Sequence, residues 1–491
     1  MRMKKKKKLV VLIFSFVIGT SILGLNEITY AADTTSPNFM THYSPADKAK
    51  AEAYSQERYE IWTKSFTNSQ KDMINSYKKD ANETNKLLVE FRGHIQALQF
   101  LAQQPGADPK LVKQVNEIEE MNKLIKVEEN KTPQTQTIYT SFSATDIGFA
   151  SNPDIEDGFL NLDEKKINTI IECLKMGSFS DFRAGNLVTS EPYSTVNAFF
   201  TQKRILIELE VPAGTYLAHL GNGQTIFPLD YGMKLTDQAG TVIGKQVLKL
   251  KALVVPKDDI LIEGDAQSLI LNKSISNILR SKGFDEKDIE SLKAQCRFMF
   301  SGPNVSLAIE NSQSAMLDLV TNEYIPNNLL RDMLLKLRLC AGITFQSVPI
   351  GRNIEIDGIT NFPENGDNPY MRIIPTHQDL LSQLDEHQST LRTLHHEFGH
   401  VIDREILNGI SSTPEFKALF EKEKNNITEI NTYANYAKTN PQEFFAEVFK
   451  SMVSMGNEKY PSSYYRDSIE KEAPETVRFI KDKLKEKGYV L

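Results

Sequence analysis

The spacing of hydrophobic and polar positions divides the first half of the chain into a helical part and a β-rich part. From about 45 to 126, apolar residues recur at helical spacings among charged ones: Ile61, Phe66, Ile74, Tyr77, Leu87, Leu88 and Phe91. The polar stretch 128–136 predicts a loop. After it, 205–211 and 247–255 are typical of β-strands, and a proline ends each. The pattern therefore predicts an α+β domain.

A second α+β unit is predicted from about residue 295, after a helical stretch at 269–294. Its expected elements are strands at 297–300 and 343–348 and helices at 309–321, 327–340, 390–407, 414–424, 441–454 and 473–487. Between them, 349–375 is rich in Gly, Pro and Asn and predicts loops and short strands. Asn408-Gly409 supplies a left-handed end for the helix at 390–407. We expect a multidomain α+β protein.

The first residues have the pattern of a secretory signal peptide. Arg2 and the lysines from Lys4 to Lys8 precede an apolar run at 9–25, and small residues follow. We expect 1–31 to be this signal peptide and 32–44 to be a polar leader. The alternative is an uncleaved anchor helix, but the apolar run is short for a membrane span. The pattern predicts a secreted, extracellular protein without a membrane anchor.

Length, charge and cysteine content narrow the class of protein. A chain of 491 residues predicts two or three domains. Removing the six basic residues and one acidic residue of the signal peptide from 57 basic and 64 acidic residues leaves a net charge of −12, which argues against nucleic acid as a partner. Cys173, Cys296 and Cys340 form no CxxC pair, which excludes a cysteine zinc site, and we expect buried thiols.

The run His396-Glu397-Phe398-Gly399-His400 places two histidines one turn apart in the predicted helix 390–407. Residues i and i+4 share a helix face, so both imidazoles can bind one zinc ion. Glu397 between them can reach a water at that ion and act as general base. The alternative is a solvated face that carries two histidines by chance, but the apolar periodicity of this helix argues against it.

A catalytic zinc needs a third protein ligand, and an acidic pair downstream offers one. Pro441 begins a predicted helix in which Glu443 and Glu447 face the same way. One carboxylate can bind zinc while the other supports a ligand imidazole. Alone, such a pair would indicate a solvated acidic face. Asp403, one turn past His400, is the rival ligand, and its other possible role is to support a ligand or lie on the helix surface.

These motifs resemble the zinc metallopeptidase family of anthrax lethal factor and the Pro-Pro endopeptidases. The likeness rests on the runs 396–403 and 443–447 and on Tyr436, and it extends loosely over 295–487. It implies a zincin-type α+β domain at 295–491, with Zn²⁺ bound by His396, His400 and Glu443. It further implies that Glu397 and Tyr436 are catalytic, with the phenol acting on the scissile carbonyl or the leaving amine, and that Glu447 supports a ligand. Tyr433 is the alternative tyrosine.

The middle of the chain resembles the ADP-ribosyltransferase domains of clostridial and bacillary binary toxins. The likeness rests on Trp62 with its following helices and on the strand-Pro-x-Gly pattern at 204–217. It implies an ADP-ribosyltransferase-like domain at 45–265, joined by a helical connector at 266–294 to the peptidase.

Three motifs of those transferases are changed here. Tyr139 is followed by Thr140 where the family has an arginine, and Ser194-Thr195-Val196 stands for Ser-Thr-Ser. Gln224-Thr225-Ile226 has no acid where the family has Glu-x-Glu. Because the chemistry cannot lose that carboxylate, we expect an inactive domain that shapes a substrate groove or exosite.

We therefore predict a secreted zinc endopeptidase that acts on protein or peptide substrates, with a role related to toxins or virulence. One alternative is a toxin-type mono-ADP-ribosyltransferase that uses NAD. Another is a non-catalytic binding protein with a structural zinc, although such a site does not need Glu397. We expect no pore-binding domain, because few residues precede the first helix. Trp62 is the only tryptophan, so a Trp wall like that of Pro-Pro enzymes is not expected.

Overall fold

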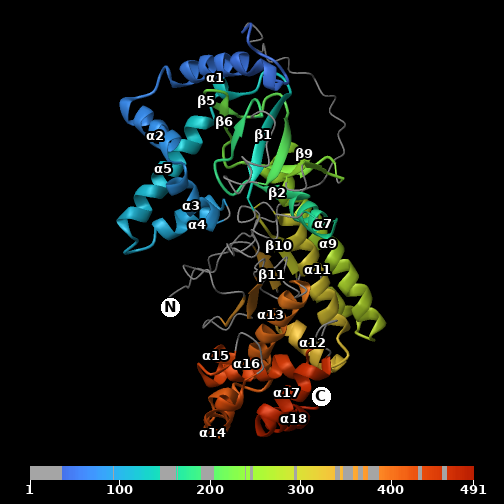
Figure 1. Cartoon of the computed structure of the whole chain (residues 1–491). Coiled ribbons are helices and arrows are strands. Elements are labelled where there is room, and N and C mark those ends of the chain that lie inside the picture. The colour runs from blue at the N-terminus through green and yellow to red at the C-terminus, as the bar shows by residue number, and fades with distance from the viewer. Residues whose placement is uncertain are drawn as a thin grey trace, which may run out of the picture.

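The computed structural model describes residues 36–91, 93–143, 162, 164–189, 204–237, 239–243, 247–291, 296–302, 304–337, 343–346, 358–362, 369–373, 386–428, 434–455 and 462–491. The predicted signal peptide lies outside these ranges, as do Cys340, Tyr433 and 194–196. Within them, two sheets carry helices around them, which confirms the α+β class (Figure 1). No helix in the described ranges is long and apolar enough to cross a membrane.

Helices form the first part, as the spacing predicted. They are α1 (Lys48–Thr63), α2 (Asn68–Lys79), α3 (Asn82–Glu90), α4 (Ile95–Ala102) and α5 (Pro109–Ile125), with 3-10 turns η1 (Pro45–Asp47) and η2 (Glu128–Asn130). Side-chain caps fix where two of them begin: Thr67 accepts from the Gln70 amide, and Asp108 accepts from the Lys110 amide. The buried Trp62 ties α1 to α5, because its indole donates to the Leu124 carbonyl at 2.7 Å.

A nine-stranded sheet follows, in the order β2-β7-β9-β4-β1-β3-β6-β5 with β8 beside β9. Its strands are β1 (Gln136–Phe142), β2 (Met176–Ser178), β3 (Ala184–Asn186), β4 (Ile205–Val211), β5 (Ala218–Gly221), β6 (Gln224–Ile226), β7 (Tyr231–Leu235), β8 (Thr241–Ile243) and β9 (Val247–Pro256). The parallel pair is β4 with β9, and the other pairs are antiparallel. The two strands predicted from apolar runs thus lie side by side within this sheet, and one face of each is buried.

The helix after this sheet differs from the prediction. α9 (Lys257–Ser281) begins directly after Pro256 rather than at Leu269, and α10 (Glu286–Ser291) follows it. The predicted boundary between 265 and 266 therefore falls inside one continuous helix. α7 (Glu164–Leu174), which the sequence did not predict, lies earlier in the chain and packs against α11.

The second sheet has four strands in the order β10-β11-β13-β12. They are β10 (Cys296–Met299), β11 (Ile343–Gln346), β12 (Gly358–Asn361) and β13 (Tyr370–Ile373). β10, β11 and β13 run parallel, and β12 pairs antiparallel with β13 at the edge of the sheet. Its helices are α11 (Val305–Thr321), α12 (Asn327–Lys336), α13 (Glu386–Val401), α14 (Pro414–Glu423), α15 (Ala434–Ala437), α16 (Pro441–Met452), α17 (Ser462–Glu472) and α18 (Pro474–Glu486), with turns η4 (Ile402–Ile406), η5 (Ile410–Ser412) and η6 (Lys424–Asn426).

One apolar core joins α9, the second sheet and the C-terminal helices. Within it, α13 packs between α11 and α16, so its motif residues are held by helices from both sides (Figure 1). The large sheet connects to this unit through Ser178 and Gly302, whose backbone and hydroxyl groups exchange hydrogen bonds of 2.8 and 2.7 Å.

Candidate metal centre

α13 presents its histidines on a helix that is otherwise anchored in the core. Leu391, Leu394, Phe398 and Val401 are almost fully buried. Gly399 lies against α16, where an added Cβ would come within 2.8 Å of the Ala446 Cα. Because that atom belongs to backbone, only glycine allows the two helices to approach this closely. This approach brings α16 side chains to the histidines of α13.

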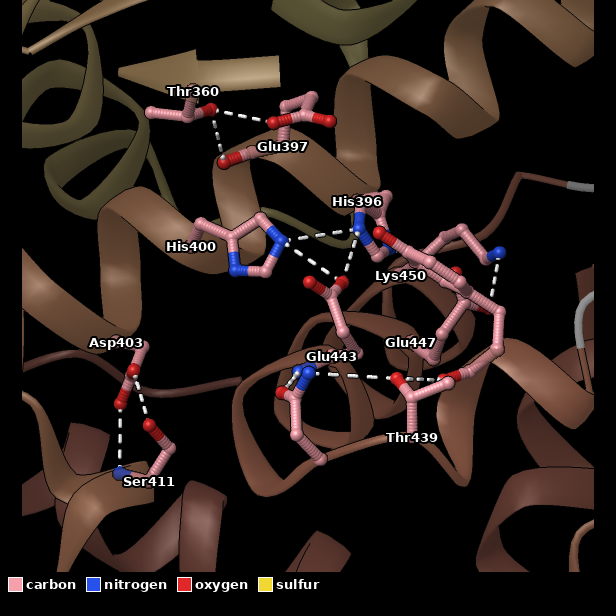
Figure 2. Close-up of polar contacts among 12 residues, drawn as sticks. Thr360, His396, Glu397, His400, Asp403, Ser411, Thr439, Glu443, Glu447 and Lys450 are labelled. Atoms are coloured by element: carbon pink, nitrogen blue, oxygen red, sulfur yellow. Dashed lines mark hydrogen bonds and ion pairs between the residues drawn. The ribbon is translucent and has the colours of Figure 1, made fainter. Parts of the chain in front are cut away.

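The start of α16 sets the position of the acidic pair. Pro441 is its first residue, and the Asn440 side chain accepts a hydrogen bond of 2.9 Å from the Glu443 amide. Glu443 and Glu447 then lie one turn apart, facing α13 (Figure 2). Local capping therefore decides which turn of the helix faces the histidines.

His396, His400 and Glu443 bring three potential ligand atoms to one place. The Nε2 atoms of the two histidines are 3.1 Å apart, and they lie 3.1 and 3.2 Å from Oε2 of Glu443. Tetrahedral ligands about 2.0–2.1 Å from a zinc ion are about 3.3–3.4 Å from each other. The observed triangle is therefore close to the size that a zinc ion needs (Figure 2).

The hydrogen bonds and charges around these three atoms favour a cation between them. Nδ1 of His396 lies 2.7 Å from Oε1 of Glu447, so the imidazole donates there and keeps its Nε2 lone pair free. In the neutral imidazole that lone pair faces Oε2 of Glu443, which also lies 3.2 Å from Nε2 of His400. Burial lowers the pKa of His396, but Glu443 and Glu447 outweigh it and raise this pKa to about 9. The site demands a positive charge, which a metal ion or a proton can supply.

Lys450 holds the Glu447 carboxylate that contacts His396. Its ammonium pairs with the Glu447 carboxylate, and both side chains are almost fully buried. Burial alone would raise the pKa of Glu447, yet Lys450 and His396 lower it to about 2. Glu447 thus stays ionised as acceptor for His396. The sequence analysis missed Lys450, although its spacing of three residues from Glu447 could have indicated the pair.

Glu397 lies beside the ligand group without joining it. It is 3% exposed, and the Thr360 hydroxyl donates to its Oε2 at 2.7 Å. Strand β12, which carries Thr360, approaches closely at Gly358, where an added Cβ would come within 2.8 Å of Oε1 of Glu397. The carboxylate is held in one orientation next to the three potential ligands. No sequence motif indicated Thr360, because it contacts Glu397 only through the fold.

Tyr436 lies next to His396. Its ring centroid lies 5.8 Å from that of His396, and the residue is 46% exposed. Burial of the hydroxyl and the nearby Glu443 carboxylate raise the pKa of Tyr436, so the phenol keeps its proton. The alternative tyrosine, Tyr433, lies outside the described residues, so its place relative to the site stays open.

Asp403 does not reach the three ligand atoms. Its carboxylate accepts hydrogen bonds from the backbone and hydroxyl of Ser411, at 2.9 and 2.5 Å, at the end of the helix (Figure 2). The following Asn408 and Gly409 have positive φ, as the left-handed helix end required. In this structure Asp403 fixes the loop after α13.

The large sheet holds a separate polar cavity of about 690 Å³ beside β1 and β3. Tyr139, Thr140 and Gln224 line it, and the Thr140 hydroxyl donates to the Ala184 carbonyl at 2.7 Å. Arg183 also lines the cavity, and its guanidinium pairs with Asp181 at 2.9 Å. Asp181 is the one acidic side chain among the described lining residues.

Two family models match this chain. The model for the anthrax toxin lethal factor, N- and C-terminal domain, matches residues 368–483. The model for the ADP-ribosyltransferase exoenzyme matches residues 51–230. The first match contains the ligand triangle, and the second contains the polar cavity.

Among characterised proteins, lethal factor of Bacillus anthracis is 23% identical over 302 residues, which cover 58% of this chain and 34% of that protein. Pro-Pro endopeptidase of Clostridioides difficile (strain 630) is 43% identical over 54 residues, covering 11% of this chain and 23% of that protein. The match thus covers 34% of the length of the first relative and 23% of the second.

Solved structures similar to this chain include Plx2a, an ADP-ribosyltransferase toxin from Paenibacillus larvae, with 19% identity and a TM-score of 0.31 over 43% of this chain and 96% of that one. The ADP-ribosylating toxin BECa of C. perfringens has 15% identity and a TM-score of 0.35 over 57% and 67%. Taken with the family models, the sequence matches place a segment similar to ADP-ribosyltransferase exoenzymes before a segment similar to lethal factor, the arrangement that the motifs predicted.

Proposed function

We propose that this chain is a secreted zinc endopeptidase that hydrolyses peptide bonds in protein substrates. The observation that carries the proposal is the convergence of His396, His400 and Glu443 beside the buried carboxylate of Glu397. Two imidazoles and one carboxylate are a donor set typical of catalytic zinc, which keeps a further position open. The similarity to lethal factor and Pro-Pro endopeptidase supports the same reaction.

His396, His400 and Glu443 would hold the zinc ion, with His396 oriented by Glu447 and Lys450. When bound, zinc supplies Lewis acidity, which polarises a carbonyl group and makes water more acidic. The protein's own side chains then handle the protons of the reaction.

Glu397 would accept a proton from the attacking water and return it to the leaving amine. Its position suits this role because Thr360 holds one carboxylate oxygen and the helix holds the residue beside the ligands. A carboxylate fixed in this way needs little rearrangement when it takes the proton of the attacking water, which lowers the entropic part of the barrier.

Tyr436 would donate a hydrogen bond to the oxygen on which charge develops during the attack. The raised pKa of Tyr436 keeps the phenol protonated at neutral pH, as a donor must be. With 46% of the residue exposed, a substrate could approach its ring. Strand β12 ends the second sheet, so an extended peptide could add to that edge next to Glu397.

Secretion forms part of the proposal and rests on the sequence of residues 1–31, a basic stretch followed by an apolar run. A toxin or virulence role rests on the names of the matched relatives, lethal factor and the exoenzymes. The domain divisions at 45–265, 266–294 and 295–491 likewise stay predictions.

The test is a metal and cleavage analysis of the purified mature chain. We expect one zinc per chain, cleavage of a peptide library at defined sites, loss of cleavage after chelation and its return with added Zn²⁺. A protein that binds zinc stoichiometrically but cleaves nothing in the library would contradict the peptidase and favour a structural zinc site. The cleavage profile would also give the specificity.

The second candidate is a mono-ADP-ribosyltransferase, which the exoenzyme model and the cavity beside β1 favour. We propose that this activity is absent, because Thr140 and Gln224 stand where the family has an arginine and a glutamate. The Glu397→Ala variant, in which peptidase artefacts are absent, should neither hydrolyse NAD nor label proteins with ADP-ribose. Measurable NAD turnover by that variant would overturn this part.

A further inference from the structure

α9 has two apolar faces, and its outer one faces solvent. The inner face is buried against β10 and α11 through Ile260, Leu271, Ile275 and Leu279. On the opposite side, Ile262, Leu269 and Ile270 are 65%, 72% and 54% exposed. Single exposed apolar residues are ordinary on a surface, but three on one helical stripe indicate a contact surface.

The outer face of α9 consists of Asp259, Ile262, Ala266, Leu269, Ile270 and Lys273. All are exposed, and at 3.6 residues per turn all lie within one side of the helix. Figure 1 shows α9 along an outer edge of the molecule, with its neighbours α11 and β10 on the inner side. A long partner helix could therefore lie along it.

Four residues of the outer face of α9 lie in mirrored positions about Ala266, whereas Leu269 mirrors Glu263. Ile262 and Ile270 each lie four residues from it, and Asp259 and Lys273 each lie seven residues from it on opposite sides. In an antiparallel pair of these helices, related by a two-fold axis at Ala266, Ile262 faces the partner's Ile270. In the same pair each Asp259 faces the partner's Lys273, so the dimer contains two Asp–Lys ion pairs. The small Ala266 side chain at the axis allows close approach.

We propose that two copies of this chain form a two-fold symmetric dimer through the outer face of α9. Self-complementarity is the reason to choose a second copy. An unrelated partner would not require isoleucines four residues to either side of one position and opposite charges seven residues to either side of it. An anionic membrane surface fits poorly, because Asp258, Asp259 and Asp265 surround the apolar residues. The proposal does not depend on the peptidase function, since α9 contributes none of the metal ligands.

The test is sedimentation velocity of the full mature chain over a range of concentrations. We expect a monomer–dimer equilibrium in which the double variant Ile262→Glu and Ile270→Glu is monomeric throughout. Asp259→Lys alone, and Lys273→Asp alone, should weaken dimerisation by ~10- to 100-fold, because like charges then face each other. The combined variant Asp259→Lys and Lys273→Asp should restore it, since the pairs re-form with reversed signs.

Leu261→Glu is the matched control. Leu261 is 40% exposed but points to another side of α9, so the dimer should remain. Circular dichroism and cleavage of a short peptide should be unchanged in every variant, which separates this result from a failure of folding or of the proposed peptidase.

A chain that is monomeric at all concentrations would overturn the proposal. A dimer that the charge exchange does not restore would overturn the antiparallel pairing. If the double Glu variant leaves the chain's mass unchanged but slows cleavage of a protein substrate and not of a short peptide, the face binds substrate instead.

Discussion

The metal centre and the cavity of the large sheet both contain a buried ion pair, but they differ in what remains unbalanced. In the cavity, Arg183 is paired with Asp181, and the guanidinium also stacks on the Phe142 ring at 4.1 Å. In the candidate metal centre, Lys450 balances Glu447, yet the Glu443 carboxylate and the Nε2 atoms of two imidazoles still meet at one point.

This difference separates structural polar groups from groups that await a ligand. A buried charge with its own partner can be retained for packing alone and is weak support for function. Acceptors that face one another without a donor are costly unless a cation joins them. The C-terminal region therefore has a stronger physical reason for chemistry than the sheet that resembles the transferases.

The largest expected effect comes from removing a ligand. His400→Ala should lose stoichiometric zinc and all detectable cleavage, because two ligands hold zinc far more weakly than three. Glu443→Gln should lower zinc affinity together with activity. Elemental analysis should measure the zinc content of both variants. Stoichiometric zinc in His400→Ala would contradict the assignment of the ligands, and with it the contrast between this site and the cavity.

Glu397→Gln should keep zinc and the fold but lower the cleavage rate by ~10²–10⁴-fold, the usual contribution of a positioned base. The amide keeps the shape of the side chain and can still accept from Thr360, so only basicity is removed. Zinc content, thermal midpoint and cleavage rate should be measured together. Loss of zinc in this variant, with retention in Glu443→Gln, would show that the two roles are exchanged.

Tyr436→Phe should lower turnover by ~10²-fold and leave zinc content and KM nearly unchanged, because the phenol stabilises charge that develops only in the transition state. Tyr433→Phe is the matched control and should be nearly fully active. If the control loses activity and Tyr436→Phe does not, the alternative tyrosine is the functional one.

In the sheet, Arg183→Met should lower the free energy of unfolding by about 3 kcal/mol, because it leaves Asp181 buried without its cation. Urea unfolding measures this change. The exposed pair of Arg280 with Glu286 is the control, and Arg280→Met should leave the midpoint nearly unchanged. Cleavage by the folded Arg183→Met chain should equal that of the parent, and a selective loss of cleavage would link the cavity to the reaction.

The last prediction concerns His219, which packs edge-on against the Tyr54 ring. Burial, with a smaller contribution from Arg58, lowers the pKa of His219 to about 3. The imidazole of His219 is therefore protonated below about pH 6.5 in the unfolded chain but stays neutral in the folded chain. The free energy of unfolding falls as pH drops from about 6.5 towards 3. The urea midpoint of His219→Gln should fall less between pH 6.5 and 4, and an equal fall would contradict this assignment.

Local signals in the sequence were sufficient for the helices of the site. The spacing of His396 and His400 places both on one face of any helix, and Pro441 begins the next one wherever the chain goes. The left-handed end at Asn408 and Gly409 was also readable, because few residues adopt positive φ. Helical spacing had made Glu443 and Glu447 candidates as a pair, and the family motifs selected Glu443 and added Tyr436, whose distance along the chain gives no geometric reason for contact.

Local signals failed where two faces of one element are apolar or where strands are short. α9 begins at Lys257, but its outer residues Ile262, Leu269 and Ile270 blur the amphipathic period that would mark its start. Short strands such as β2 and β3 have too few residues for an alternation to show. Their pairing partners, far away in the chain, decide that they are strands.

The sequence by itself thus determined the donor types, their helical spacing and the helix ends, because these depend on neighbours within one or two turns. Only the tertiary structure decided that α16 meets α13 at Gly399, that Thr360 holds Glu397, and that Lys450 is buried behind Glu447. Each of those contacts joins different helices or strands, or depends on how much water the surrounding core excludes. Such contacts arise from packing between elements, and no local pattern encodes them.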